Sequence, residues 1–459
     1  MRRTKIIVTI GPATHNYEII ETMISEGADA IRLNFSHGTH EEKKEIIKMV
    51  RDIEEELNKP IPIIGDLQGP VVRLGSFKPI ELKKRMRCKL VKGDESDSSK
   101  YEFAVPSKEI FSVVEVGDLI LVAGGLMKLT VEEVESNQIT CITLIDGTME
   151  PHKTLIVKGK EIPLHPITEK DNIDMKFCID NDVDYLMLSF IRRREHVVLF
   201  KDILRRFNAR IRVIPKIETR SAVDNLEGIL EVSDGILVAR GDLGMYFPLE
   251  EIPNIQTLIV EKCLRSGVPV MVATQLLESM IDNPLPTRSE VVDVMTAVKC
   301  GVDGLLLSGE TAIGKYPIEA VKWLRRIIES AEKTASYSVE MKAENIYDRF
   351  ARGAGLLAES LGAKILAFTR SGSTALRLSR NRLRIPIYVV TNTIKMARFI
   401  SILWGIRSFY VESKDMEECI KIAMERLKST GELSYGDIVV CIRGLRRGAT
   451  DAVNIEIIQ

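Results

Sequence analysis

The chain has 459 residues, of which 45% are apolar and 28% charged, which is typical of a folded protein of about three domains and excludes a disordered or collagen-like chain. With 64 basic and 65 acidic residues the formal net charge is −1, so we expect no nucleic-acid partner. No apolar run approaches the roughly 18 residues of a membrane span, so we expect no membrane partner. The N-terminus leads into a short apolar run without a cleavage-site pattern, so we expect no signal peptide. Seven scattered cysteines without a C-x-x-C spacing favour reduced thiols and a cytoplasmic location.

Short apolar runs alternate with amphipathic segments in two stretches of the chain, residues 1–69 and 169–336. The runs lack the polar alternation of half-exposed strands, which is typical of parallel strands covered on both faces. Eight strands, each followed by a helix, predict an α/β fold built on a closed (β/α)8 TIM barrel. The expected strands are residues 5–10, 30–35, 61–66, 185–190, 212–217, 235–239, 268–274 and 304–308. The clearest helical patterns are residues 40–57, 195–207, 255–266, 288–300 and 317–335.

Two other stretches have a different character. Residues 70–168 are rich in Val, Ile, Thr, Gly and Lys, with turn signals such as Lys92-Gly93-Asp94, and predict a small all-β domain inserted after the third strand. An insertion at the catalytic end of a barrel is well placed to act as a lid. Residues 337–459 predict a separate open α/β domain. Its expected elements are a helix over 343–361 and strands over 365–369, 387–390, 409–411, 438–442 and 455–458.

The ends of the fifth and sixth predicted barrel strands carry residues suited to phosphate and metal chemistry. Lys216 and Glu218 are two apart in a strand and therefore point to the same side. Glu218 and Asp242 offer the oxygen ligands that Mg²⁺ prefers, with substrate and water in the remaining positions. Lys216 would place a fixed positive charge beside a phosphoryl group in transit, and Gly241 lets the backbone approach an anion. Each pair alone could be a structural ion pair, but their gathering at one end of a barrel favours an active site.

The end of the second strand carries a further polar group. Arg32 and Asn34 share a face, Arg32 suits a phosphate, and Asn34 and Ser36 offer neutral oxygens. Ser36 or Thr39 could instead simply cap the helix that follows.

Together these segments closely resemble the pyruvate kinase family. The matching segments are residues 32–38 (RLNFSHG), 215–218 (PKIE), 238–244 (VARGDLG), 273–280 (ATQLLESM), 286–292 (PTRSEVV) and 307–312 (LSGETA). The resemblance covers essentially the whole chain. It implies a barrel with an inserted β lid and a C-terminal α/β domain, and domain bounds of 1–69 with 169–336, 70–168 and 337–459. It also implies a homotetramer that transfers the phosphoryl group of phosphoenolpyruvate to ADP, giving ATP and pyruvate, the last step of glycolysis.

The resemblance assigns a role to each matching position. It implies Mg²⁺ or Mn²⁺ on Glu218 and Asp242. The implied catalytic residues are Lys216 over the transferring phosphoryl group, Thr274 near the carbon that is protonated, and the phosphate-binding residues Arg32 and Arg73. The implied substrate-binding residues are Arg32, Lys216, Gly241, Asp242 and Thr274. The implied nucleotide-binding residues are Asn34, His37, Arg73 and Lys170.

Two features depart from the family pattern. Asn34, Ser36, Asp66 and Leu67 match the monovalent-cation positions, but the K⁺-dependent pattern has Thr, Lys, Glu and Thr where this chain has Leu67, Gln68, Val71 and Leu74. K⁺ is therefore a candidate cofactor, and our hypothesis is that activity does not require it. In the lid, Ala123-Gly124 replaces a pair of aspartates, so the lid contacts to the nucleotide stay open.

The C-terminal domain contains a hydroxyl-rich turn between a strand and a helix, and such a helix start is suited to phosphate. In the family this segment resembles the effector site, which implies a regulatory domain with a sugar-phosphate or nucleotide effector. A plainer interpretation is helix capping with a solvated surface. The expected effector residues are Thr369, Arg370, Ser371, Gly372, Ser373 and Thr374, with a basic loop at residues 443–450.

Two other functions stay open at this point. A metal-dependent aldolase or lyase acting on 2-keto acids would share the Glu218 and Asp242 pair on the same barrel but would need neither lid nor nucleotide. A non-enzymatic phosphate sensor would use the C-terminal turn alone, and the presence of Lys216 and Thr274 argues against it.

Overall fold

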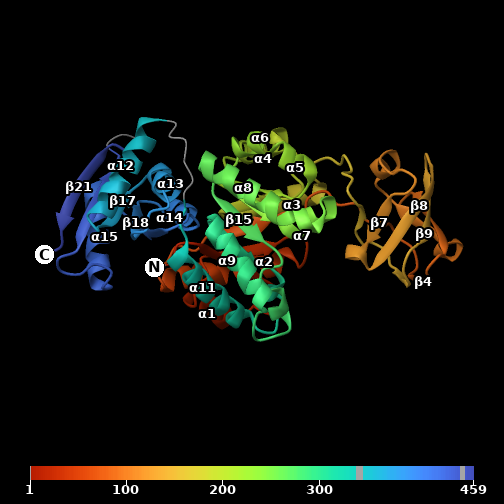
Figure 1. Ribbon diagram of the computed structural model, residues 1–459, viewed down its shortest axis with the longest axis horizontal. Coiled ribbons are helices and arrows are strands. Elements are labelled where there is room, and N and C mark those ends of the chain that lie inside the picture. The colour runs from red at the N-terminus through yellow and green to blue at the C-terminus, as the bar shows by residue number, and fades with distance from the viewer. Residues whose placement is uncertain (1, 338–344, 445–449) are drawn as a thin grey trace.

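The computed structural model describes residues 2–337, 345–444 and 450–459. At its centre, eight parallel strands close into a barrel in the order β1-β16-β15-β14-β13-β12-β3-β2, which confirms the predicted TIM barrel (Figure 1). All eight predicted strands are present, most of them one or two residues shorter. They are β1 (Lys5–Ile10), β2 (Ala30–Asn34), β3 (Ile63–Asp66), β12 (Tyr185–Leu188), β13 (Arg212–Ile217), β14 (Ile236–Ala239), β15 (Val270–Ala273) and β16 (Gly304–Leu307).

Amphipathic helices surround the barrel, and proline explains two shifted boundaries. The third strand begins at Ile63 rather than 61 because Pro62 has no N–H to donate, although its carbonyl accepts from Ile31 N at 3.0 Å. The helix predicted at 255–266 begins at Ile252, since Pro253 is tolerated in a first helical turn. The main helices are α1 (Tyr17–Ser25), α2 (His40–Glu56), α3 (Glu169–Asp180), α4 (Arg194–Arg206), α5 (Arg220–Asp224), α6 (Leu226–Leu230), α8 (Ile252–Ser266), α9 (Arg288–Cys300) and α11 (Pro317–Thr334).

The inserted region is a β domain with its own hydrophobic core, as predicted. A six-stranded sheet has the order β11-β7-β8-β9-β5-β6, and β10 pairs with β4. Neighbouring strands are antiparallel except β5 and β6. The strands are β4 (Ile80–Leu82), β5 (Arg87–Lys92), β6 (Glu102–Val105), β7 (Leu119–Val122), β8 (Met127–Glu135), β9 (Gln138–Thr143), β10 (Gly147–Met149) and β11 (Leu155–Val157).

The C-terminal region is an open α/β sheet in the order β19-β18-β17-β20-β21, parallel except for β21. The strand predicted at 409–411 is longer, and residues 343 and 344 of the predicted helix 343–361 lie outside the described residues. The strands are β17 (Lys364–Phe368), β18 (Ile387–Thr391), β19 (Ile406–Tyr410), β20 (Ile438–Arg443) and β21 (Ala452–Ile457). The helices are α12 (Ile346–Ser360), α13 (Ser373–Arg380), α14 (Ile394–Ser401) and α15 (Met416–Ser429).

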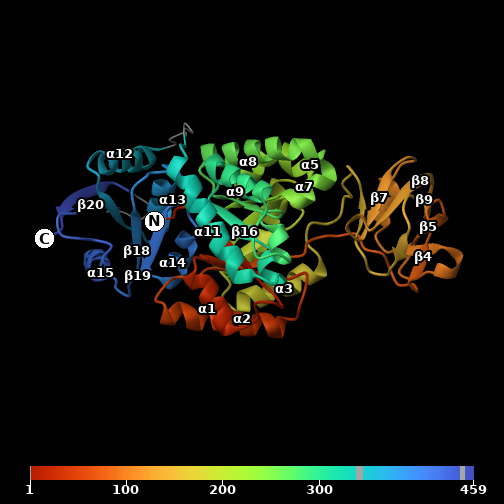
Figure 2. The same cartoon turned by 60° about the horizontal axis from the view of Figure 1, so that its bottom comes forward.

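The two smaller domains lie at opposite ends of the molecule, with the barrel between them (Figures 1 and 2). The C-terminal domain packs against the end of the barrel where the strands begin. There the Tyr185 hydroxyl donates to the Phe399 carbonyl at 2.6 Å, and Arg382 forms an ion pair with Asp303 at 2.9 Å. The β domain therefore lies on the side where the barrel strands end. Within the described residues, no helix combines the length and the apolar character needed to cross a bilayer.

Candidate active site

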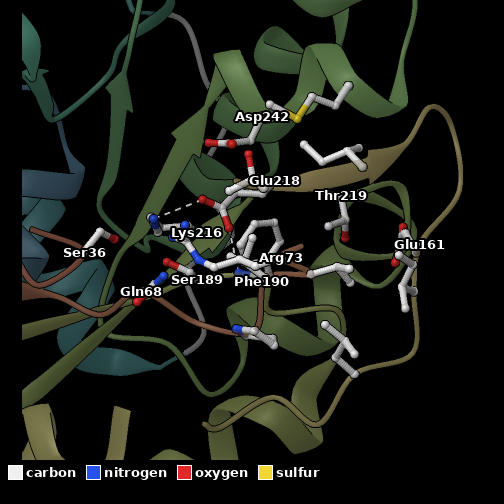
Figure 3. A pocket seen from close by; sticks show the side chains of 18 of the residues that line it. Ser36, Gln68, Arg73, Glu161, Ser189, Phe190, Lys216, Glu218, Thr219 and Asp242 are labelled. Carbon is white, nitrogen blue, oxygen red and sulfur yellow. Dashed lines mark hydrogen bonds and ion pairs between the residues drawn. The ribbon is translucent and has the colours of Figure 1, made fainter. Parts of the chain in front are cut away.

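A cavity of about 520 Å³ opens where the barrel strands end and continues to the inserted β domain. Figure 3 shows several of the side chains that line it, drawn from both domains. Its position matches the end of a TIM barrel at which catalytic residues gather. The sequence-predicted residues that line it are Arg32, Asn34, Ser36, His37, Asp66, Arg73, Lys216, Glu218 and Asp242.

Lys216 is at the centre of the charged part of this cavity. Its ammonium lies 3.1 Å from Glu218 Oε1 and 3.2 Å from Asp66 Oδ1. Asp66 also pairs with Arg32 at 2.7 Å, and the second oxygen of Glu218 accepts from Phe190 N at 2.6 Å. Lys216 and Glu218 thus do point into one space, together with Asp242 (Figure 3).

The electrostatics separate these carboxylates into two kinds. Burial raises the pKa of Glu218 to about 7, although Lys216 opposes the rise, and burial also raises the pKa of Asp242. Burial would likewise raise the pKa of Asp66, but Lys216 and Arg32 outweigh it and lower that pKa. The pKa of Lys216 is raised because three carboxylates outweigh the effect of its burial. Asp66 is therefore neutralised by the chain's own cations, whereas Glu218 and Asp242 still favour an added positive charge.

Glu218 and Asp242 fit a divalent cation in charge and in donor type, because hard cations prefer carboxylate oxygens. Among the described residues, no group of three or more His, Cys, Asp or Glu side chains is arranged to hold a metal. Two protein ligands are too few for a closed structural site. A substrate that supplies further oxygens would complete the coordination, as is usual for Mg²⁺.

Thr274 lies at the end of β15 in a conformation rare for a β-branched residue, with φ of 68° followed by 54° at Gln275. Its hydroxyl accepts a hydrogen bond from Gly241 N at 2.9 Å. The Gly241 amide thus orients the Thr274 hydroxyl, and neither residue is among those that line the 520 Å³ cavity.

Arg240 holds this unusual turn in place, a contact that the sequence reasoning missed. Its buried guanidinium donates to the Thr274 carbonyl at 2.7 Å and the Gln275 carbonyl at 2.8 Å, and it pairs with Asp293 at 2.6 Å. Asp293 is 53 residues away, so no local pattern could have shown the pair. The sequence offered only one indication of this role: Arg240 directly follows a buried strand, so its guanidinium needs hydrogen-bond partners inside the protein.

Of the four residues expected to bind the nucleotide, Asn34, His37 and Arg73 line the cavity and Lys170 does not. Arg73 comes from the segment leading into the β domain and donates to the His152 carbonyl at 3.0 Å. Asn34 Oδ1 accepts from Ser36 N at 3.0 Å and shapes the turn that carries His37. Lys170 is absent from the cavity lining, because its ammonium binds Asp174 at 2.6 Å and the Phe35 carbonyl at 2.7 Å. In the structure Lys170 thus supports the turn over residues 35–37 from behind.

The positions matching a monovalent-cation site are also divided. Asn34, Ser36 and Asp66 line the cavity, but Leu67 is 1% exposed and does not. Val71 lines the cavity and brings no charge to it.

The predicted effector turn is remote from this cavity and is internally hydrogen-bonded. Thr369 Oγ1 accepts from Gly372 N at 3.0 Å, and the Ser371 and Ser373 hydroxyls are 3.0 Å apart. Gly372, at φ of 84°, immediately precedes α13. Thr374 is buried and pairs with Thr450, and Arg370 is exposed. Residues 445–449 of the basic loop lie outside the described residues.

The fold and the cavity define a class: a barrel enzyme in which a lysine and two acids are arranged for metal-assisted phosphoryl transfer. Comparison with known families names it. Residues 1–321 match the model described as "Pyruvate kinase, barrel domain", and residues 348–458 match "Pyruvate kinase, alpha/beta domain". The chain belongs to the pyruvate kinase family.

Individual relatives match the chain over 99–100% of its own length. The chain is 36% identical to a pyruvate kinase of Clostridium acetobutylicum, covering 100% of both, and 37% identical to one of Staphylococcus aureus, covering 99% of this chain and 80% of that one. Solved pyruvate kinases from Pyrobaculum aerophilum (34% identity, 100% of both chains, TM-score 0.90) and Cryptosporidium parvum (31%, 100% and 96%, TM-score 0.93) have the same fold. The predicted family and its phosphotransferase function are confirmed, and the aldolase or lyase alternative is not favoured.

Proposed function

We propose that the chain carries out the pyruvate kinase reaction, phosphoenolpyruvate plus ADP to pyruvate plus ATP, in the 520 Å³ cavity. The observation that carries this assignment is Lys216 between Asp66 and Glu218 at 3.2 and 3.1 Å, with Asp242 facing the same space. Such a cluster neutralises charge without a covalent intermediate, which is what phosphoryl transfer requires.

The lowered pKa of Asp66 and the raised pKa values of Glu218 and Asp242 suggest which residues bind the metal and which face the phosphoryl group. Glu218 and Asp242 would hold Mg²⁺ or Mn²⁺, which when bound offsets phosphate and enolate charge. Lys216 and Arg32, both anchored by Asp66, would face the phosphoryl group, with Arg73 approaching from the β-domain side. Because Lys216 and Arg32 are already fixed by Asp66, little reorganisation is needed at the moment of transfer.

The protonation step falls to Thr274. Its hydroxyl accepts from Gly241 N, so its own hydrogen is directed elsewhere and can be delivered to the substrate carbon, directly or through an ordered water. Gly241 and Arg240 would then act by orienting Thr274.

For the nucleotide we propose contacts from Asn34, His37 and Arg73, with Lys170 acting through the turn it supports. For the monovalent cation we propose that K⁺ is not required, because the cavity wall carries Val71 and the Asp66 charge is already matched by Arg32 and Lys216. Replacing K⁺ with Na⁺ or tetramethylammonium in the assay tests this, and a tenfold loss of activity would refute it.

Regulation, assembly and location are proposed on family resemblance. We propose a cytoplasmic homotetramer with domain bounds at 69/70, 168/169 and 336/337, and a phosphorylated effector on residues 369–374. Titrating fructose 1,6-bisphosphate, glucose 6-phosphate and AMP against the phosphoenolpyruvate saturation curve, in wild type and Arg370→Ala, tests the effector. Light scattering tests the tetramer.

The decisive assay couples pyruvate formation to NADH oxidation by lactate dehydrogenase. We expect activity that needs both ADP and a divalent cation, that is lost in Glu218→Gln, and that survives in Glu227→Gln, a matched change of an exposed helical glutamate. Consumption of phosphoenolpyruvate at full rate without ADP would overturn the proposal.

A further inference from the structure

A buried lysine that does not line the catalytic cavity holds the turn carrying His37 from beneath. Lys43 lies one turn into α2 and is only 4% exposed. Its ammonium donates to the His37 carbonyl at 2.6 Å and to the Thr39 carbonyl at 3.5 Å. It also lies 5.1 Å from the centroid of the buried Phe35 ring. The hydrogen bonds of this ammonium are therefore made to neutral backbone groups of a single turn.

This position is unfavourable for a cation. Burial lowers the pKa of Lys43, and Lys170 adds to that effect, while Asp174 and Glu42 oppose it. An apolar side chain of similar length would avoid the cost of burying the charge and would still cover the Phe35 ring. Packing alone therefore does not explain the ammonium, whereas its hold on the turn does.

The hydrogen bond from Lys43 fixes the direction of one peptide group. In a trans peptide the C=O and the N–H point in opposite directions. Because the His37 carbonyl points inward to Lys43, the N–H of Gly38 points away from the buried ammonium. Gly38 is exposed and directly follows His37, which lines the catalytic cavity. Lys43 thus presents an outward N–H donor at the edge of this cavity.

The neighbouring amides of the turn are already used within the protein. Ser36 N donates to Asn34 Oδ1 at 3.0 Å, and Thr39 N donates to Glu42 Oε2 at 2.8 Å. The Gly38 N–H has no such partner within the described residues. Gly38 has a φ of 71°, and a Cβ there would lie 2.7 Å from Glu42 Oε2, so both the backbone conformation and this contact favour glycine.

We propose that Lys43 is a positioning residue for the nucleotide, which orients the His37–Gly38 peptide so that its N–H donates to an anionic oxygen of ADP. The inference rests on the proposed function, since it takes ADP to bind beside His37. A donor that is already fixed binds an anion without losing conformational freedom. Lys43 therefore acts on ADP affinity and has little effect on phosphoenolpyruvate, whose expected cationic partners are fixed by Asp66 instead.

Steady-state kinetics of a matched pair of variants test this role. Lys43→Met keeps the length of the side chain and removes the ammonium. It should raise the KM for ADP by about tenfold, the size of one lost hydrogen bond to a charged group. The kcat at saturating ADP and the KM for phosphoenolpyruvate should stay within about twofold of wild type. Lys44→Met removes the neighbouring, exposed charge and should behave like wild type.

The same kinetics separate failure of this inference from failure of the proposed function. An unchanged KM for ADP in Lys43→Met, or equal rises in both KM values, would overturn the positioning role and leave the proposed function standing. A wild-type protein without ADP-dependent turnover would overturn both.

Hydrogen–deuterium exchange of the wild-type protein, resolved to single amides by mass spectrometry, tests the proposed donor even if Lys43→Met does not fold. Saturating ADP with Mg²⁺ should slow exchange of the Gly38 amide by about tenfold, because the bound nucleotide occupies its N–H. Phosphoenolpyruvate should leave that exchange unchanged. A Gly38 amide that ADP does not protect would overturn the proposal.

Discussion

The two ends of the barrel both bury carboxylates against cations; we call the end with the catalytic cavity the open end, and the end against which the C-terminal domain packs the closed end. Where the strands begin, Asp303 is bound by both arms of Arg382 at 2.9 Å and accepts from Val270 N, and Arg398 of the C-terminal domain pairs with Glu54. Where the strands end, Glu218 and Asp242 face a cavity and keep raised pKa values. The same kind of ion pair thus serves docking at one end and catalysis at the other, and the difference is whether the chain itself supplies every counter-charge.

The largest expected effect is on catalysis at the open end. Lys216→Met should lower kcat by about a thousandfold, because it removes the preorganised charge beside the phosphoryl group. The coupled pyruvate assay measures it, and circular dichroism checks that the barrel is retained. Lys176→Met, an exposed change on α3, should behave like wild type. A Lys216→Met enzyme with kcat within tenfold of wild type would rule out the role.

At the closed end the corresponding change should affect stability instead. Arg382→Met leaves Asp303 buried without its cation and should lower the free energy of unfolding by about 3 kcal/mol, with kcat of the folded enzyme unchanged. Urea denaturation measures the loss. In the double variant with Asp303→Asn, part of the stability should return, since the unpaired charge is gone. An Arg382→Met variant that is as stable as wild type but has a lower kcat would contradict the claim that this ion pair serves docking rather than catalysis.

A smaller effect is expected where the open end depends on a positioning residue. Arg240→Gln frees the turn at Thr274 and should lower kcat by about thirtyfold with little change in KM. If the loss arises from Thr274, the exchange of pyruvate methyl protons into D2O should slow in parallel, as it should in Thr274→Val. A change in KM alone would place Arg240 in substrate binding rather than in positioning.

The smallest predicted effect is a pH dependence at the closed end. Lys5 has a folded-state pKa of about 8, below the 10.5 of the unfolded chain, so between these values the unfolded state binds more protons and stability rises with pH. Lys5→Met removes this contribution. The variant's melting temperature should therefore rise less than that of wild type, or fall more, between pH 8 and 10. Parallel curves for the two proteins would contradict the lowered pKa.

Much of the fold followed from the sequence because buried parallel strands are continuous apolar runs. Strands such as Tyr185–Leu188 and Gly304–Leu307 contain no charged residue that would interrupt the apolar run. The first residue of each strand was harder to predict. A residue such as Pro62 lacks an N–H for the sheet, so the strand begins one residue later although the apolar run continues through it. The α/β domain was found for the same reason as the barrel.

The site was predictable where its residues share one strand and less so where they meet across the fold. Lys216 and Glu218 are neighbours by the alternation of β13, and the structure brings them together. Lys170 was expected in the cavity, but Asp174, one helical turn away, holds its ammonium at 2.6 Å.

The central claim is that Glu218 and Asp242 hold one divalent cation beside Lys216. Titrating the protein with Mn²⁺ and measuring free ion by electron paramagnetic resonance tests it without reference to turnover. We predict one tight site per chain in wild type, abolished in Glu218→Gln and in Asp242→Asn and retained in Asp293→Asn, whose carboxylate pairs with Arg240 outside the proposed metal site. Equal Mn²⁺ binding by wild type and by the Glu218→Gln protein would contradict the account.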